Sequence, residues 1–204
     1  VMYYCGWEIH NYAAEQALRF IEKNMPHEPL VRFIAKTMEN PSYRAVQDLY
    51  RFLEATGIAL TPSGNFRAFK KVRRGEEGHL YDIRSGKICN DAGETVRMPR
   101  NQVDEDPDRT CSHGLHVCSY NYLDFYGFGP DLVTVQVEVN PASVVAVPRD
   151  HNNAKMRVCA YRVHSVLDNV DRPEPGLNVV DDDELLEPGM NIDDDDDDDD
   201  DDVI

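Results

Sequence analysis

Apolar residues in the first third of the chain recur at the spacing of amphipathic helices. One such pattern covers residues 11–24, a second covers residues 28–38, and a third follows Ser42, which can cap a helix that Gly57 ends. The apolar stripes consist of Ala14, Leu18, Phe20, Ile21, Leu30, Phe33, Ile34, Met38, Ala45, Val46, Leu49, Tyr50, Phe52 and Leu53. The pattern predicts a helical hairpin or a three-helix unit within residues 1–62.

Beyond residue 62 the apolar positions alternate, as they do in β-strands. The segments with strand character are residues 65–72, 80–83, 115–118, 132–139, 144–147 and 156–163. In the first of them the alternation places Phe66, Ala68 and Lys70 on one face. A single short helix is expected within residues 119–126. These elements predict a mixed, mostly antiparallel β-domain over residues 63–170, so the expected fold class is α+β.

Acidic residues are concentrated at the end of the chain. The net charge is −17, and residues 171–204 hold 17 acidic side chains and one basic side chain. Ten consecutive aspartates form Asp193–Asp202. Such a segment cannot bury enough apolar surface to offset its chain entropy, so a disordered acidic tail is expected here. The remaining 170 residues are close to neutral, so the acidity of the chain does not describe its folded body.

The sequence contains no run of 18 apolar residues, and therefore no transmembrane helix is expected. The short apolar start, Val1–Trp7, lacks the basic region of a signal peptide. The five cysteines are irregularly spaced, which indicates free thiols in a reducing compartment. We therefore expect a protein of the cytoplasm.

Two thiols and two imidazoles lie within eight residues, at Cys111, His113, His116 and Cys118. These side chains are typical zinc ligands, but their spacing matches neither C-x2-C nor H-x3-H. A strand would place only His116 and Cys118 on one face. The alternative is that both cysteines are small buried side chains beside a tight turn at Gly114. We keep the four residues as metal candidates and expect no resident metal or cofactor.

The same segment resembles the second motif of ADP-ribosyltransferase-like folds, because GLHV at residues 114–117 is followed by a serine and Tyr122. The resemblance implies that His116 lies beside a nicotinamide pocket, with Arg67 in the role of the first motif and Glu138 in the acidic role. The first motif of that superfamily is not clearly present. The alternative is that His116 is a hydrogen-bonded strand residue and Tyr122 belongs to the core. An NAD-using transferase is therefore the catalytic hypothesis.

A basic cluster, Lys70, Lys71, Arg73 and Arg74, follows the first predicted strand. Nucleic-acid surfaces combine such charges with a positive field or with stacking aromatic residues, and this body has no net positive charge. We expect the cluster to be a solvated edge, or a docking site for the acidic tail or a partner. No direct contact with nucleic acid is expected. The chain also lacks the P-loop, GxSxG, HExxH and EF-hand motifs.

Four long segments carry a resemblance to a bacteriophage family. They are PLVRFIAKTMENPSYRAVQDLYRFLEATGIALTPSGNFRAFKKV (29–72), YDIRSGK (81–87), VRMPRNQVDEDPDRTCSHGLHVCSYNYL (96–123) and VEVNPASVVAVPRDHNNAKMRVCAYRV (137–163). Together they resemble the rIIB-like proteins of tailed bacteriophages. Candidates for a functional signature, or alternatively for residues that fix turns and core, are Met98-Pro99-Arg100, Cys111, Gly114, Leu115, His116, Asn140-Pro141, Pro148 and Lys155-Met156.

The resemblance implies an accessory or regulatory protein and assigns no catalytic residues. Members of the family are associated with rapid-lysis phenotypes, and act with an rIIA-type partner to protect the infected cell from prophage-triggered early lysis. They are also linked to the host membrane. A protein that works through protein–protein contacts in the host cytoplasm is therefore expected, with peripheral association to the inner membrane through a partner.

The acidic tail predicts a contact of its own. Its carboxylates, from Asp193 to Asp202, attract basic surfaces, and its apolar tip at Ile204 can enter a small pocket. This arrangement resembles the C-terminal tails of single-stranded-DNA-binding proteins, and it also allows mimicry of DNA toward a basic protein. The alternative is a solubilising tail with no specific partner.

Overall fold

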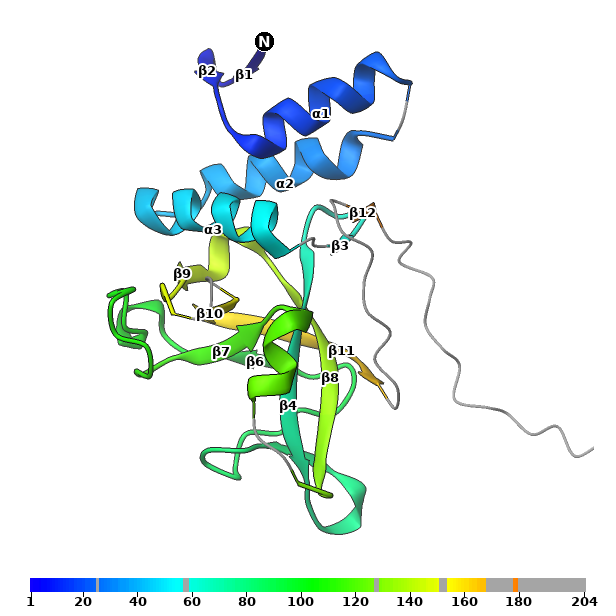
Figure 1. Ribbon diagram of the computed structural model, residues 1–204, viewed down its shortest axis with the longest axis vertical. Coiled ribbons are helices and arrows are strands. Elements are labelled where there is room, and N and C mark those ends of the chain that lie inside the picture. The colour runs from blue at the N-terminus through cyan, green and yellow to red at the C-terminus, as the bar shows by residue number, and fades with distance from the viewer. Residues whose placement is uncertain (25, 57–58, 127–128, 151–153, 168–177, 180–204) are drawn as a thin grey trace, which may run out of the picture.

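Three helices lie above a twisted β-sheet (Figure 1). The computed structural model describes residues 1–24, 26–56, 59–126, 129–150, 154–167 and 178–179. The helices are α1 (Tyr12–Glu22), α2 (Glu28–Met38) and α3 (Tyr43–Thr56). Asn11 caps α1 by accepting a hydrogen bond from Ala14 N at 2.9 Å, and Ser42 Oγ accepts one from Ala45 N at 3.2 Å. The expected three-helix unit is confirmed, whereas Gly57 lies outside the described residues.

The helices bury most of the predicted apolar faces, with one difference in α1. All six stripe residues of α3 are buried, as are the first three of α2. In α1, however, the buried residues are Ala13, Ala14 and Ala17, and Ile21 is 43% exposed. Small alanine side chains let α1 approach its neighbours closely, so its contact face is rotated away from the largest apolar residues.

The strands form a two-stranded hairpin and one large sheet. The hairpin consists of β1 (Met2–Tyr4) and β2 (Trp7–Ile9). The large sheet contains β3 (Ala59–Leu60), β4 (Phe66–Arg74), β5 (Leu80–Asp82), β6 (Thr95–Arg97), β7 (Leu115–Cys118), β8 (Leu132–Val139), β9 (Val144–Ala146), β10 (Lys155–Val158), β11 (Ala160–Leu167) and β12 (Asn178–Val179). Among the described strands, every pairing is antiparallel except the parallel pairing of β12 with β3. The α+β fold class is confirmed.

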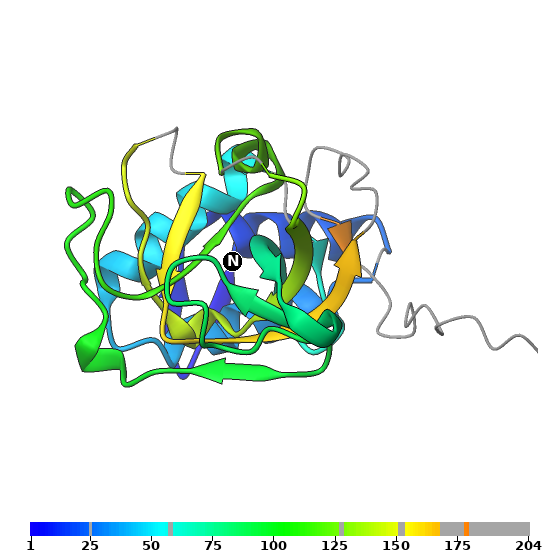
Figure 2. The same cartoon turned by 90° about the horizontal axis from the view of Figure 1, so that it is seen from below.

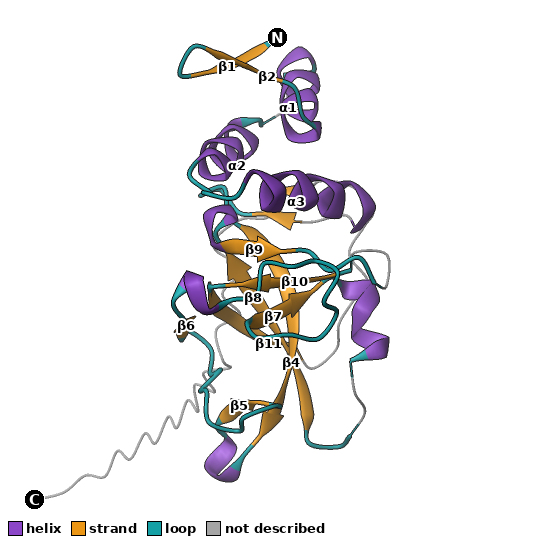
Figure 3. Cartoon of the chain, turned by 90° about the vertical axis from the view of Figure 1, so that its left-hand side faces the viewer, coloured by secondary structure: helices purple, strands orange, loops and turns teal. Residues whose placement is uncertain are grey.

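The sheet curls back on itself because one chain segment contributes to two parts of it. The strand order is β6-β11-β8-β4-β7-β10-β9, yet β10 and β11 are consecutive in the chain and separated by Cys159 alone. Figures 1 and 3 show this bent segment running through the sheet, and from below the strands lie in front of the helices (Figure 2). The predicted single strand over residues 156–163 is therefore two strands. They separate because Cys159 N donates to Ser143 O, and Cys159 O accepts from Met98 N, each at 2.9 Å.

Other elements follow the sequence pattern closely. β7 and β8 have the predicted bounds, and the short helix expected within residues 119–126 is a 3₁₀ helix, Tyr120–Phe125. Further 3₁₀ helices are Glu76–Gly78, Arg100–Gln102 and Pro141–Ser143. The predicted tail, residues 171–204, lies outside the described residues except for Asn178 and Val179. None of the helices in the described ranges combines the length and apolar character that a membrane span requires.

The helices and the sheet share one hydrophobic cluster. Phe33 of α2 packs edge-on against Tyr50 of α3, at 6.3 Å between ring centroids, and against Phe66 of β4, at 6.4 Å. Edge-to-face geometry of this kind adds to the stabilisation that burial provides. The cluster continues into the sheet through the buried faces of β4, β8 and β11.

A buried amide joins the helices to the sheet by hydrogen bonds. Asn40 Nδ2 donates to Pro141 O at 2.9 Å and to Val144 O at 2.8 Å. Asn40 Oδ1 accepts from Arg100 Nη2 at 2.8 Å, and Arg100 Nη1 donates to Ala142 O at 2.8 Å. Asn40 and Arg100 together therefore satisfy the carbonyl groups around the Pro141–Ser143 turn.

Replacing Asn40 with alanine should lower the free energy of unfolding by about 2–4 kcal/mol, because buried carbonyls and an arginine donor lose their partner. Chemical denaturation measures the change. The matched control is Asn101→Ala, which removes an exposed amide near Arg100 and should change the free energy by less than about 0.5 kcal/mol. Equal effects of the two substitutions would contradict the role given to Asn40.

Candidate functional site

Two of the residues expected for a transferase lie together. Arg67 of β4 and Glu138 of β8 are cross-strand partners, with 3.8 Å between Arg67 Nη1 and Glu138 Oε2. Glu138 Oε1 also accepts a hydrogen bond from Asn65 Nδ2 at 2.6 Å. The pair lines a cavity of about 500 Å³, which Arg162 and His164 line as well.

The other two candidates lie elsewhere. His116, on β7, lines a separate cavity that shares no lining residue with the first. Tyr122 lines neither cavity, since its ring packs against Phe125 and Tyr126 and lies 5.6 Å from Lys155 Nζ. The structure therefore does not bring the four side chains to one site.

The four metal candidates are also dispersed. Cys111 is exposed, and His113 Nδ1 lies 2.9 Å from Gln102 O. Cys118 is buried and its thiol donates to Phe69 O at 3.3 Å, and this burial raises the pKa of Cys118 to about 12. In the part of the chain that the structure describes, no group of three or more His, Cys, Asp or Glu side chains is placed to hold a metal ion. All five cysteines are described, and all carry free thiols.

The predicted basic cluster divides between surface and interior. Arg73 and Arg74 are exposed and Lys71 is half-buried, as a solvated edge requires. Lys70 is only 7% exposed, and its ammonium group donates to His116 O at 3.0 Å. The expectation of a surface role for Lys70 is wrong, because alternation along β4 places this side chain on the same face as buried Ala68.

Lys70 and His116 line the second cavity, which has a volume of about 250 Å³. We call it the lysine pocket. Met98, Leu115 and Tyr126 contribute apolar and aromatic surface to its wall. The ring of Tyr161 also lines it, with its centroid 5.7 Å from Lys70 Nζ. The wall combines this apolar surface with the polar side chains of Lys70, Asp82, Arg84, Ser85, His113 and His116, and a pocket of this kind is a candidate small-ligand site.

Burial controls the charges in the lysine pocket. Loss of hydration lowers the pKa of Lys70 to about 8, against the opposing attraction of Asp82. Loss of hydration, together with the positive charges of Lys70, Arg157 and Lys155, lowers the pKa of His116 to about 4. At neutral pH the pocket therefore holds a mostly protonated lysine beside a neutral imidazole.

Asp82 is the acidic residue of the lysine pocket, and its carboxylate is hydrogen-bonded within the turn that follows β5. Its carboxylate accepts hydrogen bonds from the backbone N–H groups of Ser85 at 2.7 Å, Ile88 at 3.1 Å and Lys87 at 3.3 Å. Partial burial favours the neutral carboxyl group, but these hydrogen bonds and that of the Ser85 hydroxyl outweigh it and lower the pKa of Asp82. Asp82 thus stabilises the turn that follows β5.

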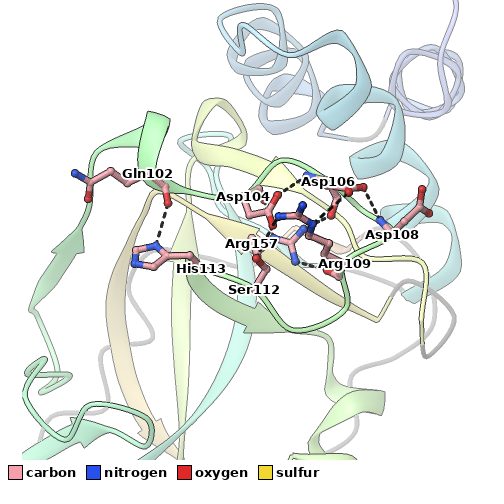
Figure 4. Close-up of polar contacts among 8 residues, drawn as sticks. All are labelled: Gln102, Asp104, Asp106, Asp108, Arg109, Ser112, His113 and Arg157. Carbon is pink, nitrogen blue, oxygen red and sulfur yellow. Dashed lines mark hydrogen bonds and ion pairs between the residues drawn. The ribbon is translucent and has the colours of Figure 1, made fainter.

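A buried arginine holds the loop that precedes β7 (Figure 4). Arg157 of β10 is fully buried and donates to three backbone carbonyls of this loop. The distances are 2.7 Å from Nε to Asp104 O, 2.5 Å from Nη2 to Asp106 O and 2.6 Å from Nη1 to Arg109 O. A guanidinium group suits this task because its donors are fixed in one plane.

Side-chain carboxylates of the loop stabilise it further by accepting hydrogen bonds from other residues of the loop. Asp104 accepts hydrogen bonds from the Ser112 hydroxyl, from Asp106 N at 2.9 Å and from Arg109 Nη1 at 3.3 Å. Together, with the Ser112 bond foremost, they lower the pKa of Asp104 to about 2. Asp106 in turn accepts from Asp108 N at 3.1 Å. The side chains of Asp104 and Asp106 therefore stabilise an ordered loop.

Gly114 connects the loop to the wall of the lysine pocket. It has a φ of +150°, and a Cβ atom there would lie 2.8 Å from Val103 Cγ1 and 3.3 Å from Arg157 Cδ. Only glycine fits this close approach. Because His113, Gly114 and Leu115 all line the lysine pocket, the loop that Arg157 holds also sets the position of that wall.

His116 makes the stability of the fold depend on pH. In the unfolded chain it gains a proton near its ordinary pKa of 6.5, whereas in the folded chain it stays neutral down to about pH 4. The unfolded state then binds more protons, so the free energy of unfolding falls as the pH drops through this window. Between about pH 7 and pH 5, the fall in the free energy of unfolding should be about 1–2 kcal/mol smaller in His116→Gln.

Chemical denaturation at a series of pH values measures this effect. His113→Gln, at a neighbouring exposed histidine, is the matched control and should retain the full fall in stability. An unchanged pH dependence in His116→Gln would contradict the burial of a neutral imidazole.

Comparison with known proteins gives a family. The family model described as Bacteriophage T4 protein rIIB matches residues 1–181. Protein rIIB of Enterobacteria phage T4 is 39% identical over 162 residues, which make up 79% of this chain and 50% of that protein. The chain thus spans about half the length of this relative. No solved structure matches the chain.

Proposed function

The chain belongs to the family of the bacteriophage T4 protein rIIB, and on that premise we propose that it is a phage regulatory protein that controls host lysis through protein–protein contacts. Its expected partner is an rIIA-type protein, and its expected role is protection against prophage-triggered early lysis. It would act in the host cytoplasm and reach the inner membrane through that partner.

The separation of the candidate catalytic groups supports this proposal independently of family membership. A transferase needs a ring side chain, a tyrosine and an acidic residue that converge on one pocket. Here Glu138 and His116 line different cavities, and Tyr122 lines neither. The geometry therefore favours a regulatory protein over the NAD-using transferase.

The N-terminal hairpin supplies a surface that suits a partner. Tyr3 of β1 is 64% exposed and Trp7 of β2 is 80% exposed. Aromatic side chains are enriched at protein interfaces, where they contribute large buried area. The hairpin lies at the end of the molecule far from the large sheet (Figure 3). A partner bound there would leave the lysine pocket open.

The acidic tail is proposed as a second contact, with a basic surface of the partner. This part of the proposal rests on Asp193–Asp202 and Ile204 in the sequence, which lie outside the described residues. A chain that ends after Val179 keeps β12 and removes the aspartates. It should recover less of the rIIA-type partner, and the difference should shrink as salt is raised. Equal recovery would contradict a contact by the tail.

The lysis time of a prophage-carrying host tests the main proposal. The phage that encodes this chain would carry Tyr3→Ser and Trp7→Ser together, and we expect early lysis with reduced recovery of the rIIA-type partner. Tyr43→Ser is the control, because Tyr43 is an 81% exposed aromatic residue at the start of α3. The control should keep the normal lysis time.

The outcomes separate the parts of this proposal. Normal lysis after deletion of the whole gene would contradict a role in lysis control. Normal lysis and partner recovery in the hairpin variant alone would contradict only the hairpin contact. Calorimetry with millimolar NAD tests the transferase directly, and a measured binding heat would favour the enzyme.

A further inference from the structure

The lysine pocket contains a buried cation with unused hydrogen-bonding capacity. An ammonium group carries three N–H donors. Among the described residues, Lys70 Nζ donates one hydrogen bond, to His116 O at 3.0 Å, and a second attraction comes from the face of the Tyr161 ring. Burial of such a charge is costly, so a further acceptor in the pocket would be stabilising.

The charges around Lys70 leave the lysine pocket positive. Asp82, the one carboxylate on the pocket wall, attracts Lys70 but forms no salt bridge with it within the described ranges, and it accepts hydrogen bonds from the backbone of its own turn. Arg84, an exposed residue on the pocket wall, adds a second positive charge. His116 is neutral at physiological pH. A ligand with negative charge would therefore gain from entering.

The size and the walls of the lysine pocket restrict the ligand further. A volume of about 250 Å³ lies below the range of about 300–1,000 Å³ that is usual for ligand sites, which favours a small ligand. Met98, Leu115 and the rings of Tyr126 and Tyr161 offer apolar surface to the body of a ligand. A small ligand that carries one negatively charged group on an apolar body is the anion of an organic acid.

We propose that the lysine pocket binds a small organic carboxylate, with the carboxylate on Lys70 Nζ and the apolar body against Met98 and Tyr161. The Tyr161 hydroxyl donates to buried Asn90 Oδ1 at 2.5 Å, and this bond holds the aromatic wall in place. The site is independent of the proposed partner contact, and its failure would leave the regulatory role untouched.

Three probes test the chemistry on the full chain, by calorimetry and ligand-observed NMR. Benzoate supplies a carboxylate and an apolar ring, benzamide is its neutral counterpart, and inorganic phosphate is an anion without an apolar body. Benzoate should bind at least about tenfold more tightly than either of the others, as expected for loss of a charge-assisted hydrogen bond or of apolar contact. Phosphate or benzamide binding as tightly as benzoate would overturn the proposal.

Two substitutions and one control substitution test whether the probe binds in the lysine pocket. Lys70→Met keeps a similar volume and should abolish benzoate binding, whereas Lys71→Met, on the opposite face of β4, should retain it. Ile88→Glu changes a pocket residue that is 37% exposed and supplies a competing carboxylate, so it should also abolish binding. Thermal unfolding checks that each variant folds. If Lys70→Met does not fold, Ile88→Glu decides alone, and unchanged binding in either folded variant would overturn the proposal.

Discussion

The hydrogen bonds of the buried Arg157 guanidinium group are the interaction on which the loop before β7 and the wall of the lysine pocket depend. It places a positive charge among backbone carbonyls of the loop between Asp104 and Arg109, with no direct carboxylate bond of its own in the described structure. The carboxylates of Asp104 and Asp106 instead accept hydrogen bonds from backbone N–H groups of the same loop. Charge and geometry thus cooperate to order a segment without regular secondary structure.

The consequences of this arrangement reach the lysine pocket. The ordered loop ends at Gly114, whose close approach to Arg157 leaves no room for a side chain, and β7 begins at the next residue. His116 then accepts the hydrogen bond of Lys70 through its backbone carbonyl. The position of the buried ammonium group therefore depends on the loop, and on the helices only indirectly through the shared core.

Sequence patterns predicted the elements well and the contacts poorly. Periodicity located α2, β7 and β8 with their correct bounds, because each buries one regular face. Alternation even placed Lys70 beside Phe66 and Ala68, yet its charge suggested the surface.

Residue type alone could not predict the sites. The motif-like spacing around His116 suggested chemistry that the sheet distributes over separate cavities. Arg157 gave no local signal, since the carbonyls it binds lie 48 or more residues away in the chain, and the sheet carbonyls that Asn40 binds lie more than 100 residues away. The signature candidates Arg100 and Gly114 gain a physical meaning only from those long-range contacts.

The titration of Lys70 tests most directly whether Arg157 shapes the lysine pocket. NMR of a chain labelled at the lysine side chains should show a midpoint near pH 8 that is absent from Lys70→Met. Arg157→Lys keeps the positive charge but loses the planar set of donors, so the wall of the lysine pocket should become less ordered and admit water. The titration midpoint of Lys70 should then rise toward the ordinary pKa of a lysine. A midpoint that stays near pH 8 in Arg157→Lys would contradict the account.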